Sequence, residues 1–556
     1  MLYVYISDRC DGRVFLNGWR KHFFLKTEIE IVPLRMFVRK KKNRSGTVSI
    51  VIVSKQSGGY KEIHSVGTGI CESEISTLVH QGKEWIRRQE ATPDIFDNYE
   101  RDKAELDAVE KFFNTIENIL INGTQLILDR VYSLIGFDRI SDKILKDLVI
   151  ARICQPGSKS ATVEYLKSHF DEDVGLSKIY RYLDVLNLTL QEQVQQISVA
   201  HTRKILGGKI GLVFYDVTTL YFETDHTDEL RKPGFSKDGK HSQPQIVLVL
   251  LVSAGGYPLS YSIHEGNKYE GHTMLPVIED FVKKFDLKEF VIVADSGLMN
   301  TDNVAELEEK EYKYILGAKI RTESNKIQSW IFSLKKENGA FYEYQKTEQA
   351  RLIVGYSDNR AKKDRYNREK GIKRLEKQYT TATLTKDKVN NRGYNKFLDI
   401  SKDVKVHINY DKIKEDERWD GLKGYITNTA LDAETVYEEY SCLWQVERAF
   451  RIGKGTLELR PMFHFTKKRI QAHVCICFVA YKVYMELERI LKNAGINLSV
   501  DKVLDIAKTI TTIKIRLPQS RQTISRTMLL TARHRLISCL FTEEFWKNEP
   551  AENRMK

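Results

Sequence analysis

The sequence lacks the features of a disulfide-bonded or a membrane-spanning protein. Its seven cysteines are odd in number and form no C-x-x-C pair, which argues against a disulfide framework and against a zinc ribbon. No apolar run reaches the roughly 18 residues that a membrane span requires. The N-terminal segment becomes charged too early for a signal peptide. We therefore expect a cytoplasmic protein with no membrane partner.

The composition indicates a multidomain protein with a polyanionic partner. Apolar residues make up 42% of the 556 residues, enough for real hydrophobic cores, and the formal net charge is +13. A basic balance of this size places nucleic acid first among the expected partners. Charge alone leaves open the other interpretation, a basic protein with no special ligand.

Changes in pattern along the chain predict seven segments. From Met36 a basic opening leads into alternating strands, so one hypothesis is that Met36 is the true start. In chain order, the expected segments are a candidate non-native extension (1–35), a β-hairpin module (36–70), a helical DNA-binding region (71–208), the first part of a core (209–319), an insertion domain (320–420), the second part of the core (421–495) and a basic C-terminal region (496–556).

The order of apolar runs in the core predicts a mixed α/β fold. Three runs suited to antiparallel pairing precede two further strands, each of which is preceded by an amphipathic helix. That order is typical of the ribonuclease-H-like fold. The expected strands are 211–223, 245–253, 258–266, 289–297 and 312–319, and the expected helices are 272–285 and 301–310.

Three acidic residues fall at notable places in this pattern. Asp216 ends an apolar tetrad, Asp295 follows a second apolar run, and Glu447 lies on a long helix expected from about 432 to 454. A carboxylate inside a central strand is costly to bury unless it is paired or bound to metal. Each acid alone has an ordinary alternative: a strand-end Asp bonded to amides, a turn Asp before glycine, and a helix salt bridge with Arg451.

The helix that carries Glu447 has a polar stripe. Tyr440, Trp444, Glu447, Arg451 and Lys454 follow one another at steps of four, three, four and three, which places them on one helical face. Such a face is not that of a hydrophobic core. Together with Asp216 and Asp295, Glu447 would hold two Mg²⁺ ions roughly 3.5–4 Å apart, the arrangement used for phosphodiester cleavage and strand transfer. Mn²⁺ is an expected substitute for Mg²⁺.

These residues resemble the bacterial insertion-sequence DDE transposases that carry a Tyr, Arg, Glu and Lys signature around the catalytic Glu. Tyr440, Glu447 and Lys454 match the signature, whereas Leu443 stands at the Arg position, with Arg448 or Arg451 as candidate replacements. The segments FYDVTTLYFE, ADSG, LELRPMFHFTKKRIQAHVCICFVAY and MFVRKKKNRSG are also similar to this branch. The resemblance covers about residues 36–490.

The resemblance implies a transposase that cuts DNA at the inverted repeats of its own element and joins the freed ends to target DNA. It implies a ribonuclease-H-like core, an insertion between Asp295 and Glu447, and a homodimer when the ends are synapsed. The expected DNA contacts are Tyr440, Arg448, Arg451 and Lys454, together with Arg360, Lys362, Lys363 and Arg365 of a very basic segment. Two alternatives remain: a metal nuclease of the same fold, and an inactive DNA-binding relative.

Overall fold

The chain divides into two compact units, Met1–Asn114 and Thr115–Lys556. The computed structural model describes residues 36–56, 59–89, 95–186, 188–235, 239, 242–268, 273–298, 301–380, 389–390, 393–400, 406–542 and 545–546. The predicted extension over residues 1–35 lies outside this range. Within the described part, no helix is both long and apolar enough to cross a membrane.

The first unit contains a three-stranded antiparallel sheet covered by a helix. The sheet order is β1-β2-β3, and α1 packs against all three strands. A Cβ atom at Gly82 of α1 would lie 3.0 Å from a methyl group of Val38, so the missing side chain lets the helix lie close to the sheet. The predicted hairpin is present. The elements are β1 (Met36–Lys42), β2 (Val48–Gln56), β3 (Gly59–Gly69), α1 (Glu72–Gln89) and α2 (Ile95–Phe113).

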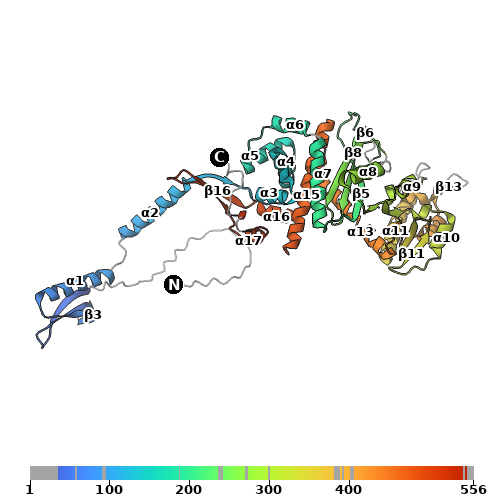
Figure 1. Cartoon of the computed structure of the whole chain (residues 1–556). Helices are drawn as coiled ribbons and strands as arrows, with labels where there is room; N and C mark the ends of the chain where they lie inside the picture. Colours follow the sequence, from blue (N-terminus) through green and yellow to red (C-terminus); the bar gives the residue numbers. More distant parts are fainter. Residues whose placement is uncertain are drawn as a thin grey trace. The chain divides into compact units, whose positions relative to one another are not determined.

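The second unit is built on a mixed sheet, to which nine strands of the described residues contribute (Figure 1). The strand order is β11-β12-β15-β10-β9-β5-β7, and both β6 and β8 pair with β7. Pairing is parallel between β5, β9 and β10 and antiparallel elsewhere. The strands are β5 (Leu212–Tyr221), β6 (Lys232–Pro233), β7 (Pro244–Ser253), β8 (Pro258–Glu265), β9 (Val291–Ala294), β10 (Lys313–Ala318), β11 (Phe341–Gln345), β12 (Arg351–Tyr356) and β15 (Leu422–Thr427).

Both faces of this sheet are covered, as the unbroken apolar sequence of β7 predicts. Leu248 and Leu250 belong to a core shared with α14 (Trp444–Arg451) and α15 (Lys467–Asn493). Val247 and Val249 alternate with them and belong to a separate core on the other face. The helices α7 (Leu188–Ile205), α8 (Met274–Phe285) and α9 (Thr301–Glu309) supply that second core.

The region predicted to be helical between 71 and 208 also contains a strand. β4 (Ile116–Leu120) pairs with β16 (Thr511–Arg516), which pairs in turn with β17 (Thr523–Met528). Helices α3 (Gly123–Ile135), α4 (Lys143–Cys154), α5 (Lys159–Phe170) and α6 (Leu176–Val185) follow β4. Of these, α3, α4 and α6 pack against α15, which also contacts β8 of the central sheet (Figure 1). Two short helices, α16 (Val500–Ala507) and α17 (Ala532–Ser538), complete the C-terminal region.

The segment predicted as an insertion contributes to the central sheet. Its strands β11 and β12 extend the sheet beyond β15. The remainder is mainly helical, and a buried ion pair between Arg368 and Asp420, 2.5 and 2.6 Å, ties the long basic helix α11 to the loop before β15. Trp419 is buried beside Phe332, so it packs in a core. The other elements are α10 (Asn325–Ser333), α11 (Asp358–Thr380), β13 (Leu398–Ile400), β14 (Val406–Ile408) and α12 (Tyr410–Glu417).

The prediction of a single long helix from about 432 to 454 is wrong. The structure has two helices, α13 (Ala433–Ser441) and α14, followed by a π-helical turn over Ile452–Thr456. At the break the backbone tightens, because the Leu443 amide donates to the Tyr440 carbonyl and the Val446 amide to the Leu443 carbonyl, each three residues back. The five residues predicted to share one stripe are therefore divided between different elements.

Candidate active site

The two aspartates lie side by side at the ends of parallel strands. The register of β5 and β9 pairs Tyr215 with Ala294, so the next positions along the two strands are Asp216 and Asp295. Neighbouring strands are about 4.8 Å apart. The amide of Val217 donates to Oδ1 of Asp216 at 2.7 Å, while Asp295, just beyond its strand, is exposed. The fold thus brings together two carboxylates that are 79 positions apart in the chain (295 − 216 = 79).

Both aspartates face the side of the sheet covered by α13 and α14. Side chains alternate along a strand, so Asp216 shares its face with Phe214, and Asp295 shares its face with Val293. Phe214 and Val293 belong to the core formed with α13 and α14. By the same alternation, Lys423 shares this face with Tyr425 of β15. Side chains from β5, β9 and β15 therefore lie on one side of the sheet.

A glycine in the same row makes room for a tyrosine hydroxyl. The β9–β10 register pairs Ala294 with Leu316, so Gly317 lies beside Asp295. A Cβ atom at Gly317 would come within 2.5 Å of the Tyr440 hydroxyl. That hydroxyl donates to Oδ1 of Asp295 at 3.0 Å, from a side chain that is only 5% exposed. Burial, and then the charge of Asp295, raise the pKa of Tyr440, so the phenol remains a neutral donor.

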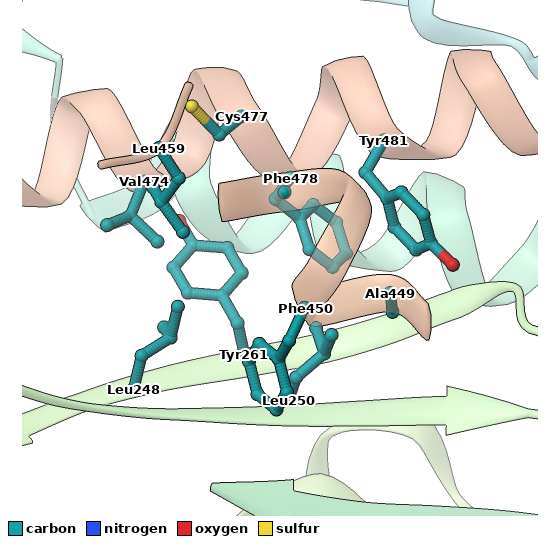
Figure 2. A pocket seen from close by; sticks show the side chains of 11 residues that line it. Leu248, Leu250, Tyr261, Ala449, Phe450, Leu459, Val474, Cys477, Phe478 and Tyr481 are labelled. Carbon is teal, nitrogen blue, oxygen red and sulfur yellow. The ribbon is translucent and has the colours of Figure 1, made fainter. Parts of the chain in front are cut away.

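Glu447 is held over the sheet by the apolar face of α14. Val446, Ala449 and Phe450 of α14 are buried where the helix packs on β5 and β7, whereas Glu447 is exposed. Figure 2 shows Ala449 and Phe450 between strand residues and the side chains of α15. The cavity left at this contact is about 40 Å³, so the packing is nearly complete. Leu248, Leu250, Tyr261, Val474 and Phe478 also line it.

The sequence did not point to Lys423, a lysine whose charge interacts with those of both Asp295 and Glu447. Lys423 is half-buried on β15, with its ammonium 4.4 Å from the centre of the Tyr440 ring. Burial, followed by the charge of Arg360, lowers the pKa of Lys423, while Asp295 and Glu447 oppose that shift. The fields of the two acids therefore overlap at this ammonium. The available signal was a lysine within the otherwise apolar strand Leu422–Thr427.

The carboxylates of Asp216 and Asp295 suit a hard divalent cation, but the described residues include no third protein ligand close to them. Mg²⁺ prefers carboxylate oxygens, and Asp216 and Asp295 present theirs from neighbouring positions. Asp295 and Glu447 both favour the charged form of Lys423, but burial and the charge of Arg360 outweigh them and lower its pKa. No group of three His, Cys, Asp or Glu side chains in the described residues is close enough to hold a metal ion as it stands. The structure thus places Asp216 and Asp295 at neighbouring positions, and Glu447 does not complete a group of three ligands with them.

The residues predicted to contact DNA fall in different surroundings. Tyr440 is buried against Asp295, and the two terminal guanidinium nitrogens of Arg448 donate to Glu488 of α15, at 3.0 and 2.6 Å. Arg451 is exposed, and Lys454 is half-buried at a separate cavity. The four predicted residues of α11, Arg360, Lys362, Lys363 and Arg365, are all exposed.

A basic cavity lies beside the acidic row, that is, the neighbouring carboxylates of Asp216 and Asp295. It measures about 370 Å³, and Lys423 and Arg360 line it together with Lys319 and Arg321. Arg360 also lies 3.7 Å from Asp364, an exposed pair that contributes little to stability. Four cations and one carboxylate, Asp364, therefore line this cavity between β15 and the N-terminal part of α11.

The site thus consists of two carboxylates at the ends of adjacent parallel strands of a mixed sheet, beside a cavity whose charged lining residues are mainly cations. Comparison with known families gives the more particular description. Residues 207–482 match the family model described as the transposase DDE domain. The matched range contains Asp216, Asp295 and Glu447.

Comparison with individual proteins adds little to this match. A cryo-EM structure of a piggyBac transposase synaptic complex with hairpin DNA is similar over 65% of this chain and 68% of that chain, at 9% identity and a TM-score of 0.36. Likeness at this level does not establish a shared function. No curated protein matches the chain.

Proposed function

We propose that this protein is an insertion-sequence DNA transposase with a ribonuclease-H-like core. In this proposal it cleaves DNA at the terminal inverted repeats of its element and joins the ends to target DNA. The observation that carries the proposal is the row formed by Asp216 and Asp295, which lies inside the range that matches the transposase DDE domain.

The sheet topology supports the ribonuclease-H-like assignment. The strands β8, β7, β5, β9 and β10 follow one another in space, and the first three pair antiparallel. The last three pair in parallel, with α8 and α9 in the connections. Asp216 lies on the central strand of this arrangement and Asp295 at the end of the next one, where sites of α/β sheets gather.

In the proposed site, Asp216, Asp295 and Glu447 would hold two Mg²⁺ ions. When bound, the ions would supply an activated oxygen nucleophile and stabilise the leaving oxygen. The chain's own residues orient these ligands. Tyr440 fixes one oxygen of Asp295 by its hydrogen bond, and α14 carries Glu447 on a helix anchored by its apolar face. Lys423 offsets part of the negative charge in the DNA-free protein.

The proposed partner is DNA, contacted through basic groups around the row. Arg451 and Lys454 follow Glu447, and the exposed cations of α11 begin beside the basic cavity. Contacts of this kind bind phosphates without reading sequence. Tyr440 and Arg448 have intramolecular partners in the DNA-free protein, so we assign them positioning roles. Synapsis of two ends requires a dimer on DNA.

The test is cleavage of a plasmid that carries the DNA flanking the gene, with Mg²⁺ or with a chelator. Asp216→Asn, Asp295→Asn and Glu447→Gln are expected to abolish cleavage and to retain binding to the ends. Asp302→Asn removes an exposed carboxylate of α9 and serves as the matched control. Cleavage by Glu447→Gln at the wild-type rate would refute the mechanism. Pre-cut ends that are not joined to target DNA would indicate a nuclease instead.

A further inference from the structure

A second basic cavity lies apart from the acidic row. It measures about 510 Å³ and opens between the loop before α5, the turn after α14 and the start of α15. Its lining is rich in groups that can carry positive charge, and Glu458 is the acidic residue among them. The basic lining residues are Arg152, Lys159, Lys454, Arg460, His464 and His473.

One buried cation of this cavity, Lys159, has no anionic partner among the described residues. Lys159 is 5% exposed, and no hydrogen bond or ion pair in the described part of the chain engages its ammonium. Arg152 is also 5% exposed and donates to the carbonyl of Gly157 at 3.1 Å. Burying a charged group without a counterion is costly, and known structures rarely retain one unless it is paired. The ammonium of Lys159 is therefore available to an anion that enters the cavity.

The groups around the cavity disfavour one another's charged forms. Burial, followed by the charge of Arg152, lowers the pKa of Lys159 to about 7. Burial, followed by the charges of Lys159 and Arg152, lowers the pKa of His464 to about 4. Glu458 is exposed and does not offset this concentration of positive charge. An anion in the cavity would relieve the repulsion among these groups.

Local structure adds to the preference for an anion. Lys159 is the first residue of α5, whose N-cap Ser158 accepts from the amide of Ala161. The N-terminus of a helix carries a partial positive charge, and here it adds to the field of the buried cations. Phe463 lies on the lining with 64% of its surface exposed, so the cavity also offers an apolar surface beside the charged groups.

We propose that this cavity binds a phosphate group of a DNA strand, with Lys159 and Arg152 as its innermost contacts. This inference rests on the proposed function, because the transposase assignment supplies DNA as the polyanion. A guanidinium can bind phosphate through two nitrogens, and an ammonium binds it as a point charge. The volume leaves room for the sugar attached to that phosphate. A free phosphate or nucleotide has the same chemistry, and the experiment separates these sources.

The test compares Lys159→Met with Lys167→Met, an exposed lysine of the same helix. Binding of inorganic phosphate is measured by calorimetry, and binding of a short labelled DNA duplex by fluorescence anisotropy at several salt concentrations. Lys159→Met should remove the phosphate signal and weaken duplex binding by about 10- to 100-fold. The slope of log affinity against log salt should become shallower by about 0.9. Lys167→Met should behave as the wild type does.

Methionine retains the apolar stem of Lys159, so the variant should fold, and thermal unfolding verifies this. Arg460→Gln changes a half-buried lining residue and should weaken duplex binding in the same direction. Wild-type duplex affinity and salt slope in both variants would overturn the inference. Loss of phosphate binding with unchanged duplex binding would overturn DNA as the source. If the wild type fails to cut DNA while Lys159 still determines duplex binding, the transposase proposal fails and this inference stands.

Discussion

Substituting Gly317 tests whether the tyrosine at the acidic row is held where the structure places it. In Gly317→Ala the new methyl group would lie 2.5 Å from the Tyr440 hydroxyl, 3.0 Å from the Ser296 amide nitrogen and 3.2 Å from the Ser296 Cβ. Ordinary contact begins at about 3.4 Å, so the hydroxyl must move away from Asp295. Overpacking of this kind costs about 1–3 kcal/mol.

Tyr440→Phe provides the matching perturbation. It removes the hydroxyl and with it a hydrogen bond to a carboxylate, worth about 1.5–3 kcal/mol, with the lower end expected because water can reach the exposed Asp295. In this background the 2.5 Å overlap disappears and the 3.0 Å approach to Ser296 becomes the closest contact. Gly317→Ala should therefore cost at least about 1 kcal/mol less in Tyr440→Phe than in the wild type.

The assay is denaturant unfolding of the wild type, the two single variants and the double variant. Gly211→Ala is the control, because a Cβ atom there meets nothing within 4 Å. Strictly additive free energies for Gly317→Ala and Tyr440→Phe would show that the hydroxyl does not lie in the space beside Gly317. The same four proteins, assayed for Mg²⁺-dependent cleavage, measure how far the fixed orientation of Asp295 contributes to activity.

Three other perturbations have defined outcomes. Lys423→Met removes an ammonium that Asp295 and Glu447 both stabilise, so half-maximal cleavage should need less Mg²⁺; an increased requirement in a Mg²⁺ titration would contradict this. Lys159 has a folded pKa of about 7 against an ordinary value of 10.5, so the unfolded chain binds more protons between these values and wild-type stability rises with pH across that range. Lys159→Met should lack this rise. Its free energy of unfolding should exceed that of the wild type by up to a few kcal/mol near pH 7 and should equal it above about pH 10.5. Urea unfolding at both pH values measures the difference. Arg448→Ala removes both hydrogen bonds to the Glu488 carboxylate and should lower the melting temperature. Adding Glu488→Gln to that variant should recover part of the loss. A double variant that melts no higher than Arg448→Ala would argue against a stabilising pair.

The core strands were predictable because their signals are local. Apolar runs bounded by turns located β5, β7, β8, β9 and β10, and their order along the chain predicted a mixed α/β fold. Asp216 and Asp295 were found in the same way, since a carboxylate next to an apolar run is unusual. The register that makes Asp216 and Asp295 neighbours could not be predicted, because it depends on how separate strands align.

The remaining features depend on contacts distant in sequence or on small changes in the backbone. The break between α13 and α14 has no glycine or proline to signal it, and it follows from a few hydrogen bonds made three residues back. Periodicity therefore predicted one helix and placed Tyr440 with Glu447 on one polar stripe, whereas Tyr440 is buried in the core. The role of Gly317 depends on the Tyr440 hydroxyl beside it, which comes from a distant part of the chain.

The pairing of β4 with β16 has a consequence for how the protein is made. β4 leaves the ribosome well before its neighbour in the sheet, residues 511–516, is synthesised. Until then β4 has an unsatisfied edge, which in a crowded cell invites pairing with other chains. A truncated product that ends before β16 would keep this edge permanently, so we expect it to aggregate or to be degraded.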